Sequence, residues 1–301
     1  MMFTKMHGLG NNYILFDQLD NPENILPEED YPELSRKVSD VNFGIGSDGI
    51  ILICQSEQAD FKMRIFNEDG SEAKNCGNGL RCVAKFLYDH LYATTPHFTI
   101  ETLGGIVSVH VELNRNKIVE YVTVDMGGPK LFKGMIPMEG DPSTKAINEA
   151  FIIGEEAYTL TCLSMGNPHA IMFVDNVYEV ALEVIGPVLE YYRLFPERVN
   201  VGVVHVKNRQ EMDYRVWERG SGITMACGTG ACASVVAAIL NDQIDRNQAI
   251  LVHLPGGDLT IRWDNEGHVW MRGKASYIGY GELDGTFNLN NNDLQLGGRI
   301  K

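Results

Sequence analysis

The sequence is poor in basic residues and has no long hydrophobic run. Its 301 residues include 25 Lys and Arg against 40 Asp and Glu, which gives a formal net charge of −15. A surface with this balance repels phosphate backbones and anionic lipid, so we expect neither a nucleic-acid partner nor a membrane partner. The longest apolar stretch, Ala231 to Leu240, is too short to span a bilayer.

The cysteines never form a Cys-x-x-Cys pair, which argues against a thiol redox protein. Met1 to Gly10 contains Lys5 and His7 and lacks the apolar core of a signal peptide. We therefore expect a cytoplasmic protein. In that compartment the six cysteines are thiols rather than a disulfide framework.

One short phrase occurs twice, half a chain apart. Residues 76–79 read Cys-Gly-Asn-Gly and residues 227–230 read Cys-Gly-Thr-Gly. Similar phrases precede both, Arg-Ile-Phe-Asn at 64–67 and Arg-Val-Trp-Glu at 215–218. A period of this length is too long for a solenoid, and the chain is long enough for two cores of about 150 residues each. The pattern predicts an internal duplication that gives two homologous domains.

Each cysteine phrase leads into an apolar run with helical spacing, at 80–91 and at 231–240. We therefore expect Cys76 and Cys227 each at the N-terminus of a helix. The free N–H groups and the dipole of a helix start favour negative charge and lower the pKa of a cysteine placed there. Two such thiols, one from each half, predict a site between the halves with one sulfur on each side of a substrate.

Strand-like segments outnumber helical ones in both halves. In the first half they lie at 13–16, 50–54, 61–66, 99–102, 106–113 and 118–126, and in the second at 158–163, 170–174, 201–206, 213–217, 249–254, 259–263 and 268–272, with a further helical segment at 178–192. We predict an α+β fold of two homologous domains, each a curved, barrel-like mixed β-sheet wrapped around a central helix, with the active site in the cleft between them.

The predicted domain boundaries follow from glycine-rich and polar segments. The first domain covers residues 1–127, and a returning strand near 276–288 is a candidate for its completion. The second domain covers residues 128–275. Residues 289–301 are polar and rich in Asn and Gly, which predicts a loose tail.

A pair of opposed thiols suits the inversion of a stereocentre by proton transfer. One group removes a Cα proton from one face and the other returns a proton to the opposite face, so two acid–base groups must flank one carbon. Such catalysis works best with groups that hold either protonation state near neutral pH. The two helix starts would meanwhile stabilise the charge that builds on the substrate carboxylate.

Longer motifs around these residues resemble the diaminopimelate epimerase family. The motifs are Lys-Met-His-Gly-Leu-Gly-Asn at 5–11, Asn-Glu-Asp-Gly-Ser-Glu-Ala at 67–73, Cys-Gly-Asn-Gly-Leu-Arg-Cys at 76–82, Gly-Asn-Pro-His at 166–169, Glu-Arg-Gly-Ser-Gly at 218–222 and Ala-Cys-Gly-Thr-Gly-Ala-Cys at 226–232. The resemblance implies an isomerase, independent of pyridoxal phosphate, that interconverts LL- and meso-2,6-diaminopimelate for lysine and peptidoglycan synthesis. It implies no cofactor, no metal, a small-molecule substrate and a homodimer.

The same resemblance implies roles for individual residues. Cys227 would deprotonate the LL isomer and Cys76 would protonate the opposite face, while His169 and Glu218 would help to set the protonation of the thiols. The implied substrate-binding residues are Asn11, Asn67, Gly77, Asn78, Asn167, Asn200, Glu218, Arg219, Gly228 and Thr229. The chain departs from the family at Gly49, where several relatives carry a glutamine that contacts substrate.

Other interpretations of these residues remain open. Cys54, Cys82, Cys162 and Cys232 are expected in the core. A zinc site at Cys227 and Cys232 is disfavoured, because five helical residues at about 100° each turn the two sulfurs apart. His169 could be an ordinary loop histidine, and Asn200 a turn residue.

The competing functions are a proline racemase-like enzyme and a thiol redox or metal-binding protein. The proline enzymes usually carry a histidine where this chain has Asn78.

Overall fold

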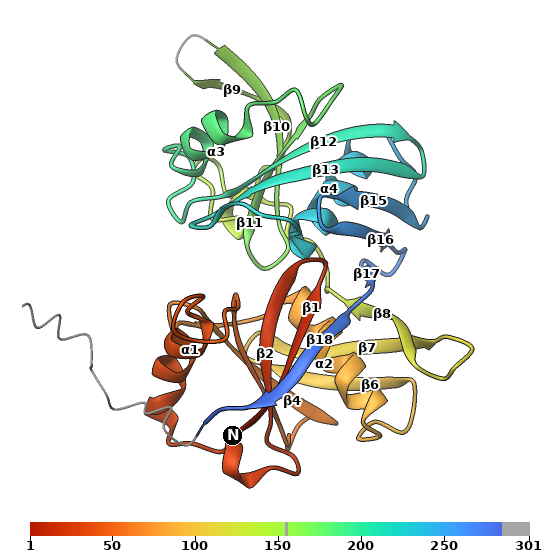
Figure 1. Cartoon of the computed structure of the whole chain (residues 1–301). Coiled ribbons are helices and arrows are strands. Elements are labelled where there is room, and N and C mark those ends of the chain that lie inside the picture. Colours follow the sequence, from red (N-terminus) through yellow and green to blue (C-terminus); the bar gives the residue numbers. More distant parts are fainter. Residues whose placement is uncertain (154–155, 285–301) are drawn as a thin grey trace, which may run out of the picture.

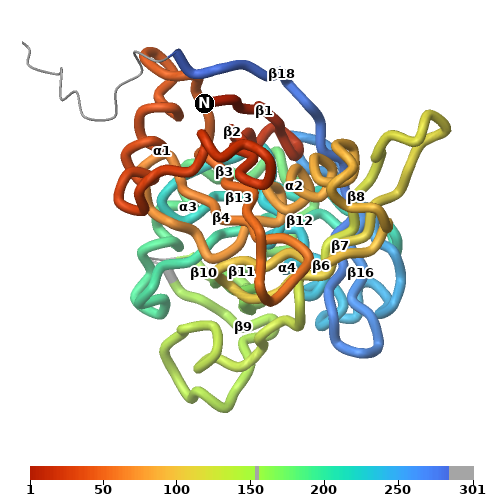
Figure 2. Tube along the Cα trace, turned by 90° about the horizontal axis from the view of Figure 1, so that it is seen from below, coloured from red at the N-terminus to blue at the C-terminus, as the bar shows by residue number. Residues whose placement is uncertain are grey.

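The computed structural model describes residues 1–153 and 156–284, which form two lobes stacked along one axis (Figures 1 and 2). The predicted tail at 289–301 and the last part of the segment predicted at 276–288 lie outside the described residues. The strands are β1 (Met2–Gly8), β2 (Asn11–Asp17), β3 (Gly49–Cys54), β4 (Phe61–Asn67), β5 (Glu72–Ala73), β6 (His97–Thr102), β7 (Gly105–Leu113), β8 (Val119–Asp125), β9 (Ala146–Ile153), β10 (Glu156–Ser164), β11 (Pro168–Phe173), β12 (Asn200–Asn208), β13 (Glu211–Glu218), β14 (Gly222–Ile223), β15 (Ile250–Leu254), β16 (Gly257–Trp263), β17 (Val269–Gly273) and β18 (Ser276–Glu282). The α-helices are α1 (Tyr31–Ser39), α2 (Gly77–Asp89), α3 (Leu182–Glu190) and α4 (Gly228–Leu240), and short 3-10 turns occupy Pro22–Asn24, Glu28–Asp30 and Lys133–Met135.

The two lobes repeat one strand pattern. In the first, β2 pairs parallel with β3, β3 antiparallel with β4, and β4 parallel with β6. In the second, β11, β12, β13 and β15 pair in the same sense and order. β8 and β17 occupy equivalent places in the two patterns, and they pair antiparallel with each other, which joins the two sheets.

The last described strand returns to the first lobe. β18 pairs antiparallel with β1, from Met2 opposite Glu282 to His7 opposite Ser276. In Figure 1 it lies as a blue strand among the red strands of the N-terminal lobe. We keep the domain boundaries at 127/128 and 275/276 as a proposal.

Helices α2 and α4 lie inside the sheets, and α1 and α3 cover outer faces. Residues 13–16 of β2 are all apolar because this part of the strand is buried on both faces. Tyr13 and Leu15 face the core that contains α2, and Ile14 and Phe16 face the core formed with α1. A strand that is buried on both faces has no polar alternation. The central position of α2 and α4 therefore fixes where their N-termini point.

One predicted segment has other bounds in the structure, and some elements were not predicted. The helix predicted at 178–192 is shorter in the structure, where α3 spans Leu182–Glu190. Pro187 lies inside this helix. Helix α1 and strand β9 were not predicted, since α1 has only a short apolar stripe and β9 has little alternation. Within the described residues, no helix combines the length and apolarity that crossing a bilayer demands.

The two central helices meet at one methionine. A Cβ placed on Gly77, the first residue of α2, would lie 2.5 Å from the Met271 Cε atom. A Cβ on Gly228, the first residue of α4, would lie 2.9 Å from the Met271 Sδ atom. Both distances are too short for real contacts, so glycine at each helix start allows both helices to approach the same side chain of β17.

This packing predicts a coupling between Gly228 and Met271. Gly228→Ala should lower the free energy of unfolding by about 1–3 kcal/mol, because the added methyl group overpacks the junction. Met271→Ala should cost about 2–5 kcal/mol on its own, and the double variant should lose at least about 1 kcal/mol less than the sum of the two. Urea unfolding of all three variants measures these values.

Gly279→Ala is the control, since a Cβ there meets nothing within 4 Å. It should leave the urea midpoint unchanged. Strictly additive losses at Gly228 and Met271 would contradict the shared contact.

Candidate active site

Cys76 is the N-cap residue of α2, and its sulfur has three polar neighbours. The Gly79 N–H donates to Cys76 Sγ at 3.4 Å, as expected at a helix start. The Tyr13 hydroxyl lies 3.1 Å from the same sulfur, and the Asn11 Oδ1 atom lies 4.0 Å from it. This thiol therefore faces both the helix N-terminus and two side chains from the start of β2.

Cys227 occupies the equivalent N-cap position of α4 but is more deeply buried, with 4% of its surface exposed. Burial raises the pKa of this thiol well above its ordinary value, and the charge of the Glu218 carboxylate raises it further. The Thr229 hydroxyl, 3.5 Å from Cys227 Sγ, opposes this shift. The sequence-based expectation of a lowered pKa is therefore wrong for Cys227, because desolvation and a neighbouring carboxylate outweigh the helix start.

Glu218, the last residue of β13, is the second acid–base group beside Cys227. Burial raises the pKa of its carboxyl, and the Thr224 hydroxyl opposes this by donating to Oε1 at 2.5 Å. The charge of Asp48, which belongs to the other lobe, also raises the pKa of Glu218. Two groups that each resist ionisation thus lie together, and a proton can be shared between them.

His169 is fully buried on β11 and reaches Cys227 through Thr229. Its Nε2 atom lies 3.0 Å from Asn167 Oδ1 and 3.1 Å from Thr229 Oγ1. Burial, followed by the charge of Arg219, lowers the pKa of His169 to about 3, so the ring is neutral at physiological pH. An amide oxygen only accepts, so Nε2 carries the ring proton, and the Thr229 hydroxyl remains free to donate to the sulfur.

Asn78 ties the two helix starts together. Its Nδ2 group donates to Asn11 Oδ1 at 3.2 Å and to the Ala226 carbonyl, just before Cys227, at 3.3 Å. Its Oδ1 atom accepts from Arg81 at 2.9 Å. Arg81 has no exposed surface, and it donates also to the Lys274 carbonyl at 3.2 Å. Within the described part of the chain Arg81 has no salt bridge, so its charge lies unpaired behind the helix starts.

The remaining predicted residues divide into two groups. Asn11 and Asn167 lie with the thiol residues through the contacts just described. Asn67 contacts its own turn, donating from Nδ2 to Ser71 Oγ at 3.0 Å. The guanidinium of Arg219 donates to the Glu197 carbonyl at 2.7 Å. Asn200 is 3% exposed, and both polar atoms of its side chain bond to backbone groups. Its Nδ2 group donates to the Pro168 carbonyl, and its Oδ1 atom accepts from the Arg219 N–H.

Gly49 has a backbone reason to lack a side chain. Its φ is +149°, and a Cβ there would lie 2.1 Å from the Phe66 carbonyl oxygen on the neighbouring strand. A glutamine cannot occupy this position without a shift of the backbone.

Sequence reasoning missed Tyr13, Arg81 and Thr224 as parts of the site. Tyr13 is the first residue of the apolar part of β2 and therefore resembles a core residue. Arg81 carried a usable signal, because it is a charged residue between Leu80 and Cys82 in the apolar first half of the helix.

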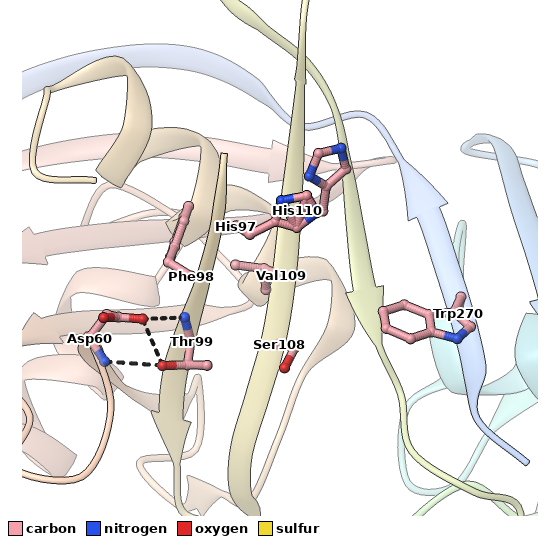
Figure 3. Close-up of a pocket in the computed structure, with 8 residues that line it drawn as sticks. All are labelled: Asp60, His97, Phe98, Thr99, Ser108, Val109, His110 and Trp270. Atoms are coloured by element: carbon pink, nitrogen blue, oxygen red, sulfur yellow. Dashed lines mark hydrogen bonds between the residues drawn. The ribbon is translucent and has the colours of Figure 1, made fainter. Parts of the chain in front are cut away.

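A separate pocket of about 360 Å³ lies along β6 and β7 of the first lobe, with Trp270 of β17 at its edge, and is drawn in Figure 3. It is lined by Asp60, His97, Phe98, Thr99, Ser108, Val109, His110 and Trp270. The rings of His97 and His110 stack at 3.9 Å, and Asp60 bonds Thr99. None of the predicted site residues lines this pocket. Among the residues that the structure describes, no three His, Cys, Asp or Glu side chains form a group that could hold a metal ion.

The chain matches a family described as diaminopimelate epimerase over residues 3–132 and 161–278. Similar proteins named diaminopimelate epimerase occur in Bacillus cytotoxicus, 54% identical over 279 residues, which are 93% of this chain and 96% of that protein, and in Bacillus cereus strain AH187, 53% identical over the same shares. The diaminopimelate epimerase of Bacillus anthracis strain CDC 684 is 53% identical over 92% of this chain and 94% of its own length.

Solved structures share the fold at much lower identity. A probable proline racemase from Agrobacterium radiobacter K84 is 14% identical with a TM-score of 0.68, over 94% of this chain and 92% of its own. A PhzF-family phenazine biosynthesis protein from Bacillus anthracis is 18% identical with a TM-score of 0.65, over 94% and 98%. These likenesses and the two matched segments confirm the predicted two-domain α+β fold. By its family match and its curated relatives, the chain belongs to the diaminopimelate epimerase family.

Proposed function

We propose that the protein interconverts LL- and meso-2,6-diaminopimelate by moving protons at Cα between two cysteines, without a cofactor. The observation that carries this proposal is the placement of Cys76 and Cys227 as N-cap residues of two helices whose starts are joined through Asn78. One thiol comes from each lobe, which suits attack on opposite faces of one carbon.

The helix starts supply the electrostatics of the reaction. The N–H groups of Gly77, Asn78, Gly228 and Thr229 belong to the first turns of α2 and α4, where a helix leaves N–H groups without intrahelical partners. A carboxylate held there gains negative charge as the α-proton leaves, and fixed N–H dipoles stabilise that charge. The unpaired charge of Arg81 behind Asn78 acts in the same direction.

Cys227 needs help to act as the base toward the LL isomer, because burial keeps it protonated. The Glu218 carboxylate can take its proton, and the Thr229 hydroxyl can donate to the resulting thiolate. The α-ammonium group of a bound substrate would add a positive charge beside the sulfur and favour the thiolate further. Cys76 then returns a proton to the opposite face.

The other predicted residues would bind the substrate. Asn11, Asn67, Asn167, Asn200 and Arg219 would contact it largely at its distal amino-acid head, and His169 would orient Thr229. We also place the enzyme in the cytoplasm, where its six free cysteines stay reduced.

The proposed homodimer has a candidate surface at β18. Ile278 is 54% exposed and Tyr280 is 86% exposed on this strand, which pairs only with β1 in the described part of the chain. An exposed apolar edge strand is a template for pairing with another chain.

The activity itself is tested by incubating the pure protein with LL-2,6-diaminopimelate and no added cofactor. We expect the meso isomer to appear until the two isomers reach equilibrium. L-proline should turn over very poorly, since it lacks the distal head whose binding positions the reacting carbon. Rapid turnover of proline would support the proline racemase-like alternative instead.

Removal of either active thiol should nearly abolish epimerisation. Cys76→Ala and Cys227→Ala should each lower kcat by about 10²- to 10⁴-fold, because each removes one acid–base partner. Cys82→Ala and Cys232→Ala are matched controls on the same helices, and both residues are buried in the core. They should keep kcat near that of the parent enzyme. Near-normal turnover by either active-thiol variant would rule out two-thiol catalysis.

Glu218→Gln should change two properties in opposite directions: Cys227 should be alkylated faster, and epimerisation should be slower. Without the carboxylate charge the pKa of Cys227 falls, so iodoacetamide should alkylate this thiol about tenfold faster near neutral pH. Epimerisation should fall nonetheless, because the group that accepts the thiol proton is gone. Glu211→Gln, at the partly exposed start of β13, is the control. Slower alkylation of Cys227 in Glu218→Gln would contradict the assigned charge effect.

Disruption of the β18 surface should produce monomers. Sedimentation equilibrium of the parent protein should give twice the chain mass of 33.5 kDa. Tyr280→Asp should shift the mass toward a single chain, since it places a charge within the apolar contact. Tyr178→Asp, at a residue that is 70% exposed on the other lobe, should leave the dimer intact. A monomeric parent protein would refute the homodimer.

A further inference from the structure

The buried hydroxyl of Tyr13 is a polar group in contact with one active thiol that the proposed reaction leaves without a role. Tyr13 is 5% exposed, and its hydroxyl lies 2.6 Å from Asn11 Oδ1 and 3.1 Å from Cys76 Sγ. Both distances allow hydrogen bonds, and a phenol has only one proton to donate. The identity of the donor at each contact therefore decides which form of Cys76 the site favours.

The proton positions follow from the chemistry of the three groups. An amide oxygen only accepts, so the short contact with Asn11 Oδ1 requires the Tyr13 proton. The lone pairs of the Tyr13 oxygen then face Cys76 Sγ, where they can accept from S–H but would repel a thiolate. Asn11 Oδ1 is held in this role, because Asn78 Nδ2 also donates to it at 3.2 Å.

We propose that Tyr13 is a positioning residue that keeps Cys76 as the protonated partner of the thiol pair in the empty site. This inference rests on the proposed function, in which Cys76 protonates the carbon that Cys227 has deprotonated. An S–H group held by an acceptor 3.1 Å away is ready to donate and has a defined direction.

The same contact defines the proton transfer at Cys76. When the S–H bond breaks, its proton joins the substrate carbon; in the opposite direction the thiolate takes the α-proton, and the S–H bond that forms again donates to the Tyr13 oxygen. No proton leaves the Tyr13 oxygen in either case, because Asn11 Oδ1 keeps it.

The second lobe has no equivalent of this arrangement. The buried hydroxyl of Tyr214, whose charged form would interact with Cys227, has no hydrogen-bond partner among the described residues. Cys227 instead contacts Thr229 and Glu218. The two thiols are therefore inequivalent before substrate binds.

The test is the alkylation of each cysteine by iodoacetamide, followed by peptide mass mapping of the full-length protein without substrate. In Tyr13→Phe, Cys76 should be alkylated about tenfold faster near neutral pH, because loss of one hydrogen bond to the thiol form frees the thiolate. Cys227 should react at the parental rate. At strongly alkaline pH, where the thiolate dominates in both proteins, the Cys76 rates of the two proteins should converge.

Two further variants complete the test. Asn11→Leu removes the acceptor, so the Tyr13 proton is free to turn to the sulfur, and Cys76 should again react faster near neutral pH. Tyr214→Phe is the matched control and should leave Cys76 alkylation unchanged. In steady-state assays Tyr13→Phe should lower kcat about tenfold with little change in KM, since the hydroxyl is bonded to Asn11 and Cys76 and acts through the thiol.

An unchanged or slower alkylation of Cys76 in Tyr13→Phe would overturn the inference, and so would a rate increase that persists at high pH, which would indicate better access alone. These readouts need no substrate. A parent protein that fails to epimerise diaminopimelate would refute the proposed function but would leave the result on Tyr13 intact.

Discussion

The arrangement of the candidate active site depends on the hydrogen bond that runs from Asn78, at the start of α2, to the carbonyl that precedes α4. Arg81 fixes the orientation of Asn78, and Asn78 in turn fixes Asn11. Burying a guanidinium without a carboxylate costs several kcal/mol unless hydrogen bonds offset the loss of water. Here the offset comes from Asn78 and from the Lys274 carbonyl, so the charge is held where two helix N-termini meet.

Burial and charge decide how each thiol behaves, and the two helix starts alone do not. A helix terminus contributes about 0.3–1 kcal/mol, whereas full burial shifts the pKa of an ionisable group by up to several units. At Cys227 burial and Glu218 therefore dominate, and the pKa rises. Base strength at this site must come from proton acceptance by Glu218 and from the substrate's own charge. This explains why Cys227 can rest as a thiol until substrate arrives.

The sequence alone predicted the duplication, the α+β class and the positions of α2 and α4, because repeated motifs and apolar periodicity are local signals. It could not reveal Tyr13, whose role arises only when β2 is brought against α2. It also gave the wrong direction for the pKa of Cys227, because desolvation depends on packing from both lobes. Helix α1 was missed for a related reason, since a short helix is stabilised mainly by the sheet face that it covers.

The central claim is that the two thiols serve opposite faces of one carbon, and isotope exchange tests it most directly. LL-2,6-diaminopimelate is incubated with the parent enzyme in D₂O, and deuterium at Cα is measured early in both isomers. The account predicts deuterium in the newly formed meso isomer, delivered by Cys76 after exchange with solvent, while the remaining LL isomer keeps its proton. Equal early labelling of both isomers would show a single base that serves both faces and would contradict the account.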